Sequence, residues 1–267
     1  MNQNNKMVSF LYGNLLGRIL LKMIMKLHID RIIVKFLCSS YSKPIIPYFI
    51  EHNNIDIPSE QKETFKTFRD CFARTNEYLS IDETPEHLIS PCDGYLSVFP
   101  IDKSSTFSIK KSHYKLTDFL KDEELSKKYI DGTCLIFRLC VSDYHHYCFI
   151  DDGYQGENHY IEGQLHSVQP IACETIPVYV LNRRSWALLS THHFGNVIQC
   201  EIGALVVGGI VNEIENNHFK KGDEKGHFEL AGSTIVLLFE KNKIKLNPEY
   251  SQEEVKVKLG QWIGNSI

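Results

Sequence analysis

Several features that would identify a common class of protein are missing from these 267 residues. The eight cysteines form no C-x-x-C pair, which argues against a zinc ribbon or a thiol redox motif. Acidic residues outnumber basic ones and give a net charge of −4, whereas proteins that bind nucleic acid usually carry a basic excess. The sequence has no internal repeat and no G-x-S-x-G motif of the serine hydrolases. What remains, with 43% hydrophobic and 23% charged residues, is an ordinary globular composition.

Most of the cysteines stand in apolar surroundings, so we expect reduced, buried thiols and a reducing, intracellular compartment. Residues 8–37 are rich in Leu, Ile and Met, but no apolar run reaches the roughly 18 residues of a membrane span. No signal peptide is evident either. The cations that interrupt this stretch are Arg18, Lys22, Lys26, Arg31 and Lys35.

The first of these cations share one helical face, and the last two fall on another, so we predict two short helices with a break near 28–30. From Lys6 to Lys43 the net charge is +6. Basic amphipathic helices lie in the plane of an anionic bilayer. Ordinary helices that pack on a core with their lysines in water have the same pattern, and the pattern alone does not separate the two interpretations.

The remainder of the chain predicts one helix followed by many strands. Phe65, Phe68 and Phe72 share one face of a helix expected over 59–75, with Ser59 as its N-cap. β-Branched and aromatic segments separated by glycines predict a largely antiparallel sheet. The expected fold is therefore α+β, with N-terminal helices on an antiparallel β-rich core. The predicted strands are 95–99, 134–141, 160–168, 178–181, 197–202, 204–210 and 234–239.

Three segments could carry chemistry, although each also has a purely structural interpretation. Ser90–Gly94 places Asp93 in a turn formed by proline and glycine, a common loop arrangement. In 137–148 a strand leads into Asp, Tyr and His residues, which are either catalytic or ordinary surface and core side chains. In 221–239 a Gly-Ser-Thr precedes a very apolar strand, as a tight turn would. A glycine before a serine also leaves its carbonyl open to attack by the neighbouring hydroxyl.

Taken together, these segments resemble the phosphatidylserine decarboxylase proenzyme family over nearly the whole chain. The likeness rests on the order of the motifs, which ends in Gly232-Ser233-Thr234. The matching segments are the basic N-terminal region, Phe65–Arg74, Ser90–Gly94, Arg138–His145, Gly203–Ile210 and Lys221–Phe239. The resemblance divides the chain into a membrane-binding region, 1–50, and a decarboxylase domain, 51–267.

The resemblance implies that the protein makes its own cofactor and uses no metal. Ser233 would attack the carbonyl of Gly232 and become a pyruvoyl group on a small chain, 233–267, that stays associated with a large chain, 1–232. Asp93 matches the family's orienting aspartate, and His145 its catalytic histidine. The family's second histidine, assigned to self-cleavage, is replaced here by Cys148, so either His145 serves both steps or His146 covers the cleavage.

The implied reaction is decarboxylation of phosphatidylserine to phosphatidylethanolamine. The partner would be phosphatidylserine in an anionic membrane, and the protein would be a peripheral one on the cytoplasmic face of that membrane. No nucleic-acid partner is expected, and a homodimer is possible. Conceivable phosphate contacts are His166, Arg183 and Arg184, each of which also suits a solvent or core role. Two other readings stay open: an uncleaved, non-enzymatic membrane scaffold, and a pyruvoyl-dependent decarboxylase of a soluble amino acid.

Overall fold

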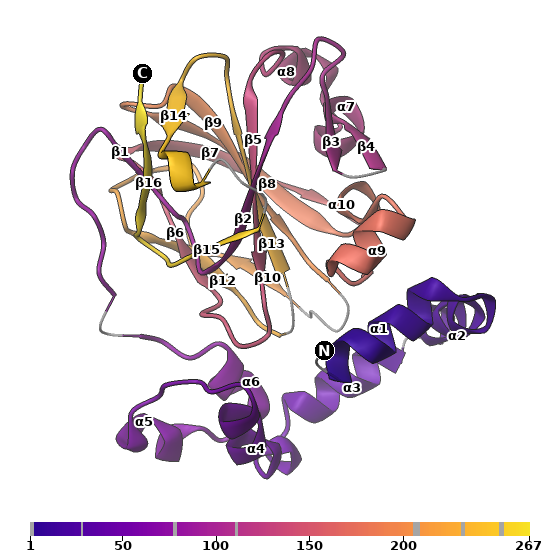
Figure 1. Cartoon of the computed structure of the whole chain (residues 1–267). Coiled ribbons are helices and arrows are strands. Elements are labelled where there is room, and N and C mark those ends of the chain that lie inside the picture. Colours follow the sequence, from indigo (N-terminus) through magenta and orange to yellow (C-terminus); the bar gives the residue numbers. More distant parts are fainter. Residues whose placement is uncertain are drawn as a thin grey trace.

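The computed structural model describes residues 3–27, 29–76, 79–109, 112–204, 209–230, 233–250 and 254–267. Figure 1 shows a β-rich body with the N-terminal helices gathered at one end of it. The first six helices lie within residues 3–72, and the strands lie between residues 87 and 266. This arrangement confirms the α+β class. All eight cysteines are free thiols, and six of them are buried, as expected.

Three helices form the N-terminal region: α1 (Gln3–Gly13), α2 (Leu15–Lys26) and α3 (Ile29–Leu37). The break predicted near 28–30 is confirmed, although His28 itself lies outside the described residues. A further break was not predicted: the Asn14 side chain caps α2 by accepting a hydrogen bond from the Gly17 amide at 2.8 Å. In the described part of the chain, no single helix is long and apolar enough to span a membrane. One pair of helices reaches that length and apolarity together, but the pair, Lys6–Gly13 and Leu15–Lys26, is bent by 97°.

A second helical group follows and has its own small apolar core. The helix expected over 59–75 is interrupted, because Thr67 and Asp70 form a capping box that starts a new helix. Ser59 is the first helical residue and not the N-cap. Phe65, Phe68 and Phe72 are nevertheless all buried in one cluster, as predicted. The elements are η1 (Ser40–Ser42), α4 (Ile45–His52), α5 (Ser59–Thr64) and α6 (Phe68–Phe72).

The largest sheet in the described residues has eight strands, every neighbouring pair antiparallel, in the order β11-β7-β8-β9-β13-β5-β2-β15. Its central strand β13 is buried at every residue, because it has neighbours on both sides and no polar residue after Thr234. The bounds are β2 (Gly94–Pro100), β5 (Thr133–Leu139), β7 (Gly153–Ile161), β8 (Arg184–Thr191), β9 (Asn196–Ile202), β11 (Asn217–Phe219), β13 (Ser233–Phe239) and β15 (Val255–Val257).

Two smaller sheets and a hairpin complete the body. Their strands are β1 (His87–Ile89), β16 (Trp262–Ser266) and β14 (Ile244–Leu246); β10 (Ile210–Asn212), β12 (Glu224–Phe228) and β6 (His146–Cys148); and β3 (Thr106–Ile109) with β4 (Ser112–Lys115). Short helices cover the connections: α7 (Leu116–Leu120), α8 (Glu123–Lys127), α9 (Pro170–Thr175), α10 (Val178–Leu181) and η2 (Pro248–Tyr250). Helix α1 packs on α9, which joins the helical end to the body.

The strand predictions are confirmed at 95–99, 197–202 and 234–239, and over most of 134–141. The prediction at 178–181 is wrong, since these residues form one turn of helix, α10. A four-residue apolar run suits a buried helical turn as well as a strand. The strand expected over 160–168 ends at Ile161 with β7. Of the strand expected over 204–210, residues 205–208 lie outside the described residues, and Ile210 begins β10.

Candidate active site

Ser233 is the first residue of β13 and pairs with Leu139, the last residue of β5. Its side chain is fully buried, and its hydroxyl has no hydrogen-bond partner among the described residues. The same is true of the neighbouring Thr234 hydroxyl. A buried polar group without a partner costs about 1–3 kcal/mol and therefore points to a functional role. Gly232, the other half of the predicted cleavage site, lies outside the described residues.

His145 lies in the loop between β5 and β6 and is also fully buried. Its ring packs on Phe72 of α6 with the two ring centroids 4.0 Å apart. Neither ring nitrogen has a hydrogen-bond partner in the described part of the chain. Burial, followed by the nearby Arg74 guanidinium, lowers the pKa of His145 to about 3. The imidazole is therefore neutral at neutral pH, and its lone pair takes up a proton only transiently, while one is being transferred.

The fold brings Ser233 and the His145 loop to the same end of the sheet. The loop leaves β5 next to Leu139, the residue that Ser233 faces across the ladder. On its other side, the loop is held by the Phe228 amide, which donates to the His145 carbonyl at 3.0 Å. Phe228 ends β12, five residues before Ser233 along the chain. The hydroxyl and the imidazole are not hydrogen-bonded to each other, so both stay available for chemistry.

His146 and Cys148, the other two residues considered for the cleavage step, differ from His145 in this respect. His146 Nδ1 lies 2.7 Å from the Glu224 carboxylate, and its Nε2 lies 3.1 Å from the Ala73 carbonyl oxygen. Both ring nitrogens are therefore engaged. Cys148 is fully buried, and burial raises the pKa of its thiol to about 12, so the thiol does not ionise at neutral pH. Of the two histidines, His145 is the one whose ring nitrogens have no hydrogen-bond partner in the described residues, and the Cys148 thiol is not a base at neutral pH.

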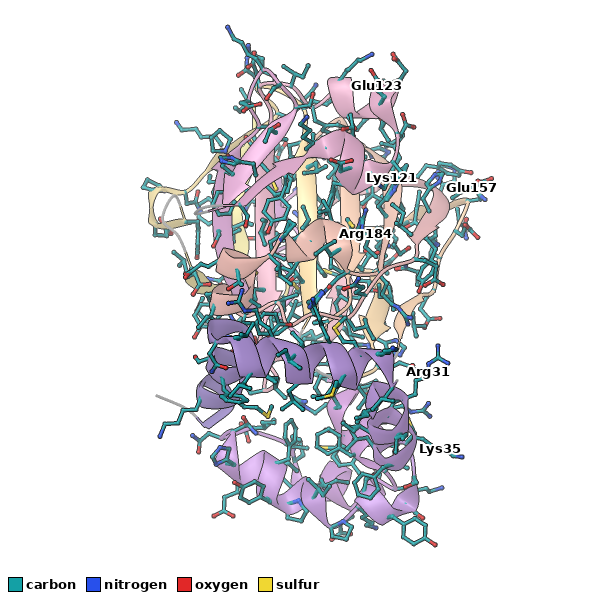
Figure 2. All side chains as sticks on the ribbon, turned by 90° about the vertical axis from the view of Figure 1, so that its right-hand side faces the viewer. Arg31, Lys35, Lys121, Glu123, Glu157 and Arg184 are labelled. Atoms are coloured by element: carbon teal, nitrogen blue, oxygen red, sulfur yellow. The ribbon has the colours of Figure 1, made fainter. Side chains whose placement is uncertain are left out.

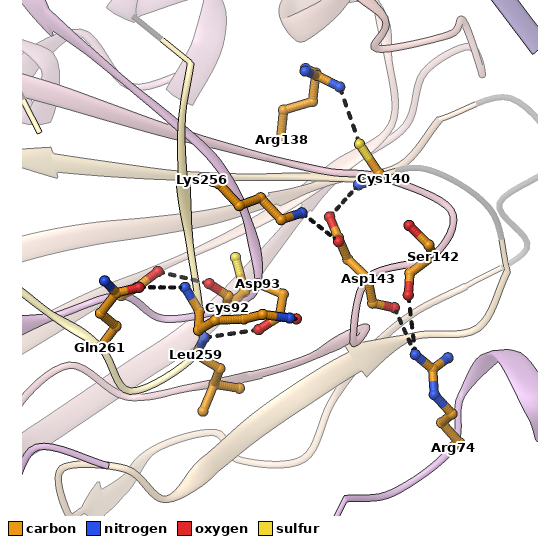
Figure 3. Close-up of polar contacts among 12 residues, drawn as sticks. Arg74, Cys92, Asp93, Arg138, Cys140, Ser142, Asp143, Lys256, Leu259 and Gln261 are labelled. Carbon is orange, nitrogen blue, oxygen red and sulfur yellow. Dashed lines mark hydrogen bonds and ion pairs between the residues drawn. The ribbon is translucent and has the colours of Figure 1, made fainter. Parts of the chain in front are cut away.

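A polar network that the sequence reasoning missed supports the loop before His145 (Figure 3). Arg74, just after α6, donates to the carbonyl oxygens of Ser142 at 3.2 Å and Asp143 at 3.4 Å. The Asp143 carboxylate accepts from the Cys140 amide at 2.7 Å and pairs with Lys256 at 2.6 Å. Arg74 and Asp143 both stand in segments that resemble family motifs, which could have marked them. Lys256 lies outside the segments that resemble family motifs, so the sequence did not mark it.

Asp93 is buried at the start of β2, where its carboxylate pairs with Lys258 at 2.7 Å and accepts from the Leu259 amide at 3.0 Å. It has no hydrogen bond with His145, whose nitrogens are unpartnered in the described residues. The orienting role of Asp93 therefore stays a prediction. Asp93 does share a polar cavity of about 620 Å³ with the loop network, and this cavity is lined among others by Arg74, Asp143, Tyr144, Lys256 and Lys258.

A second, larger cavity of about 710 Å³ lies between the N-terminal helices and the β-rich body. Its wall combines cations with apolar side chains: Arg18, Lys22, Lys26, Arg31 and Arg183 together with Leu21, Ile24, Met25, Leu165, Ile176 and Leu181. His166 also lines it, so two of the three conceivable phosphate contacts are present. Arg184 is not among them.

Arg184 has the core role that the sequence also allowed, because its side chain is fully buried inside the body. Its guanidinium donates to four backbone carbonyl oxygens at 2.8–2.9 Å, those of Asp118, Phe119, Val180 and Asn182. Arg184 therefore holds α7 and α10 against β8 and does not face the cavity.

The comparisons with known proteins agree with the geometry. The family model described as phosphatidylserine decarboxylase matches residues 68–265. The chain is 43% identical over 270 residues to phosphatidylserine decarboxylase proenzyme 2 of Clostridium acetobutylicum, and this alignment covers 98% of the chain and 92% of the relative. It is 39% identical over 272 residues to the phosphatidylserine decarboxylase proenzyme of Clostridium kluyveri, with 97% and 92% covered. The corresponding protein of Ruminiclostridium cellulolyticum is 38% identical, with 98% and 92% covered.

Proposed function

Since this chain belongs to the phosphatidylserine decarboxylase family, we propose that it converts phosphatidylserine to phosphatidylethanolamine and carbon dioxide, using a pyruvoyl group formed from its own Ser233. The observation that carries the proposal is the fully buried Ser233 hydroxyl without a hydrogen-bond partner in the described residues. A serine at the start of a core strand gains nothing from such a position structurally. It suits a hydroxyl that is consumed.

The self-cleavage uses the residues that flank the scissile bond. Ser233 Oγ attacks the Gly232 carbonyl carbon, the peptide C–N bond breaks, and the hydroxyl proton passes through a base to the freed nitrogen. Loss of the Ser233 Cα proton then breaks the Cβ–Oγ bond and releases chain 1–232 with a terminal carboxylate. Water replaces the nitrogen of residue 233 with oxygen, and ammonia leaves. We assign the base to His145, because its neutral imidazole has no competing hydrogen bond in the described residues.

In the lipid reaction, the pyruvoyl carbonyl supplies an electron sink for the electron pair that is left when carbon dioxide departs. The protein has to exclude water and return one proton to the substrate carbon. The apolar wall around His145, formed in part by Phe72, excludes water. We assign the proton delivery to His145 as well, after its ring has taken up a proton.

The cavity between the helices and the body supports a lipid substrate. An anionic phospholipid needs cations for its phosphate and apolar side chains for its acyl chains, and the wall offers both. The cavity is also close to the site. The Gly203 amide donates to the carbonyl of Arg183 in the cavity wall at 3.1 Å, and the preceding Ile202 pairs with Thr234. One strand, β9, thus separates this part of the wall from the first residues of β13. A decarboxylase of a soluble amino acid has no need for such a wall.

The exposed surface of the N-terminal helices supports a membrane as the partner. Large apolar side chains rarely gather on the surface of a water-soluble domain. Here they do so over residues 7–48, where Leu15, Leu16, Leu27, Ile32 and Tyr41 are each at least 66% exposed. Arg31 and Lys35 point outward from the same helices (Figure 2). We propose that α1–α3 lie on the cytoplasmic face of an anionic membrane and make this a peripheral protein.

The decisive experiment follows chain cleavage and lipid product in the same preparation. The full chain is purified, its intact mass is measured, and phosphatidylethanolamine is assayed with phosphatidylserine vesicles. We expect two chains, 1–232 and 233–267, and product from the lipid but not from free serine. Ser233→Ala should abolish both cleavage and product, whereas Ser108→Ala, on the β3–β4 hairpin, should change neither. A wild-type chain that stays whole in such vesicles would support the scaffold, and turnover of free serine would support the soluble decarboxylase.

Membrane binding is tested separately by vesicle sedimentation. The double variant Arg31→Glu/Lys35→Glu reverses two cations of α3 at the helical end. Lys121→Glu/Lys127→Glu reverses two in and just before α8, which lies at the opposite end of the molecule (Figure 1). At about 1 kcal/mol per cation near an anionic surface, the first variant should bind phosphatidylserine vesicles at least about 30-fold more weakly. The second should bind like the wild type. Equal binding by both variants would refute the assignment of the membrane face.

A further inference from the structure

Three side chains of metal-ligating type converge outside the site described so far. They are His146 of β6 and both Glu224 and His227 of β12, and their ligand atoms all lie within 4.8 Å of one another. His146 and His227 are directly opposite each other in the antiparallel ladder, and their rings stack with centroids 4.9 Å apart. Glu224, three residues before His227, would face the other way in a regular strand. The register shift between Glu224 and Gly226 turns it toward the histidines.

The hydrogen bonds of His146 leave one position unexplained. Its Nε2 lies 3.1 Å from the Ala73 carbonyl oxygen, which can only accept, so Nε2 carries a proton. In the neutral ring, Nδ1 then has a lone pair, yet it lies 2.7 Å from Glu224 Oε1, an oxygen that also only accepts. Either an extra proton or a cation has to lie between them. The third group, His227 Nδ1, is buried without a hydrogen-bond partner in the described residues and lies 3.9 Å from the same oxygen.

We propose that His146, Glu224 and His227 form a binding site for a divalent cation of the zinc type. Zinc bonds to imidazole nitrogen and carboxylate oxygen at about 2.0–2.2 Å, which in tetrahedral geometry separates the ligand atoms by about 3.3 Å. Glu224 therefore has to move by about 0.6 Å away from His146 Nδ1, and the stacked His227 ring has to turn toward the ion, because the three ligand atoms lie within 4.8 Å and not about 3.3 Å of one another. The Glu224 side chain is 47% exposed and that of His227 22% exposed, which leaves both room to move. The bond from His146 Nε2 to Ala73 is the outer contact that orients a metal-binding histidine. Glu213, 3.7 Å from His227 Nδ1, or water fills the fourth position.

Such an ion would join β6 to β12 at a point next to the proposed chemistry. His146 adjoins His145 in the chain, and His227 precedes Phe228, whose amide holds the His145 carbonyl at 3.0 Å. β12 ends at Phe228, five residues before Ser233 along the chain. The cation would thus clamp the two segments that position the imidazole. The site itself does not depend on the proposed function, because it consists of side chains on two paired strands.

The test is metal binding by the uncleaved full chain, in the Ser233→Ala background so that processing does not differ between variants. Protein stripped with a chelator is titrated with Zn²⁺ against a chromophoric competitor, and Co²⁺ is used as a spectroscopic probe of tetrahedral coordination. We expect one equivalent to bind. Glu224→Gln and His227→Gln should each lower the affinity by about 100-fold or more. His193→Gln is the matched control and should leave the affinity unchanged, since His193 pairs with Asp151 at 2.9 Å and has no third metal-binding side chain beside it among the residues that the structure describes.

Two results would overturn the proposal. The first is a stripped protein that binds less than one equivalent of Zn²⁺. The second is binding that Glu224→Gln and His227→Gln leave as tight as before, which would move the metal to other groups such as the thiols. Thermal unfolding of each variant without metal shows whether it is folded. His227→Asn keeps a smaller amide in place and serves as the second variant if His227→Gln is not folded.

Discussion

Replacing His145 with phenylalanine should slow self-cleavage without weakening the fold. The ring packs on Phe72 at 4.0 Å, and neither of its nitrogens makes a hydrogen bond in the described residues, so the substitution breaks none. It removes buried polar atoms whose unsatisfied state costs about 1–3 kcal/mol, and the larger ring consumes part of that gain through tighter packing. A positioned general base contributes about 10²–10⁴ in rate, or about 3–5 kcal/mol of barrier. The variant should therefore cleave that much more slowly and have an unchanged or higher melting temperature.

Cleavage is followed by intact mass over time after synthesis, and stability is compared between Ser233→Ala and Ser233→Ala/His145→Phe, which are both uncleaved. A net gain of 1 kcal/mol corresponds to about 2–4 °C in a chain of this size. Cys148→Ala is the control, because the protonated thiol at the family's second histidine position has no role in the proposed step. Wild-type cleavage by His145→Phe would refute the assignment, and loss of cleavage in His146→Gln would then identify the neighbouring ring as the base. A clear drop in melting temperature would contradict the stability argument.

Two further predictions concern stability, and both are measured by urea unfolding. Lys225→Met should cost about 3–5 kcal/mol, because the fully buried Glu201 carboxylate, 2.9 Å from Lys225, loses its cation and keeps, among the described residues, only the hydrogen bond from Asn212. Lys241→Met, which breaks an exposed pair of the same length with Asp131, should cost at most about 1 kcal/mol. Equal costs would contradict this. Burial lowers the pKa of His166, which contacts Tyr12 and Gln164 and lines the cavity that also holds the cations. The folded protein therefore favours the neutral ring, and unfolding becomes easier as the pH falls below the unfolded pKa of about 6.5. His166→Gln should flatten that dependence between pH 7.5 and 5.5, and an unchanged slope would refute it.

The sequence predicts the parts of this protein that depend on local patterns. The apolar run after Ser233 gives the central strand, and its burial follows from composition alone. Ser233 and His145 were identified because each stands in a short motif, and the structure brings their strand ends together. The membrane interpretation of the N-terminal helices was one of two alternatives, because their five cations and apolar residues are contiguous in the chain, and it stays a proposal.

Contacts between distant segments could not be predicted in the same way. Arg74 and Lys256 are far from Asp143 in sequence, and only the folded sheet places their charges beside the loop. The interruption of the helix at Thr67 depends on a capping box that competes with the aromatic periodicity. The apolar turn at 178–181 has too few residues for a helix to be told from a strand.

The position of β13 between β9 and β5 has a consequence for the lifetime of the protein. The proposed cut before Ser233 would turn a strand that is buried at every residue into the start of a separate short chain. Such a fragment would aggregate if it were made alone, so the fold has to be complete before the backbone is opened. Once unfolded, the cleaved protein would not refold. Its working life would then be set by how fast it unfolds and not by an equilibrium.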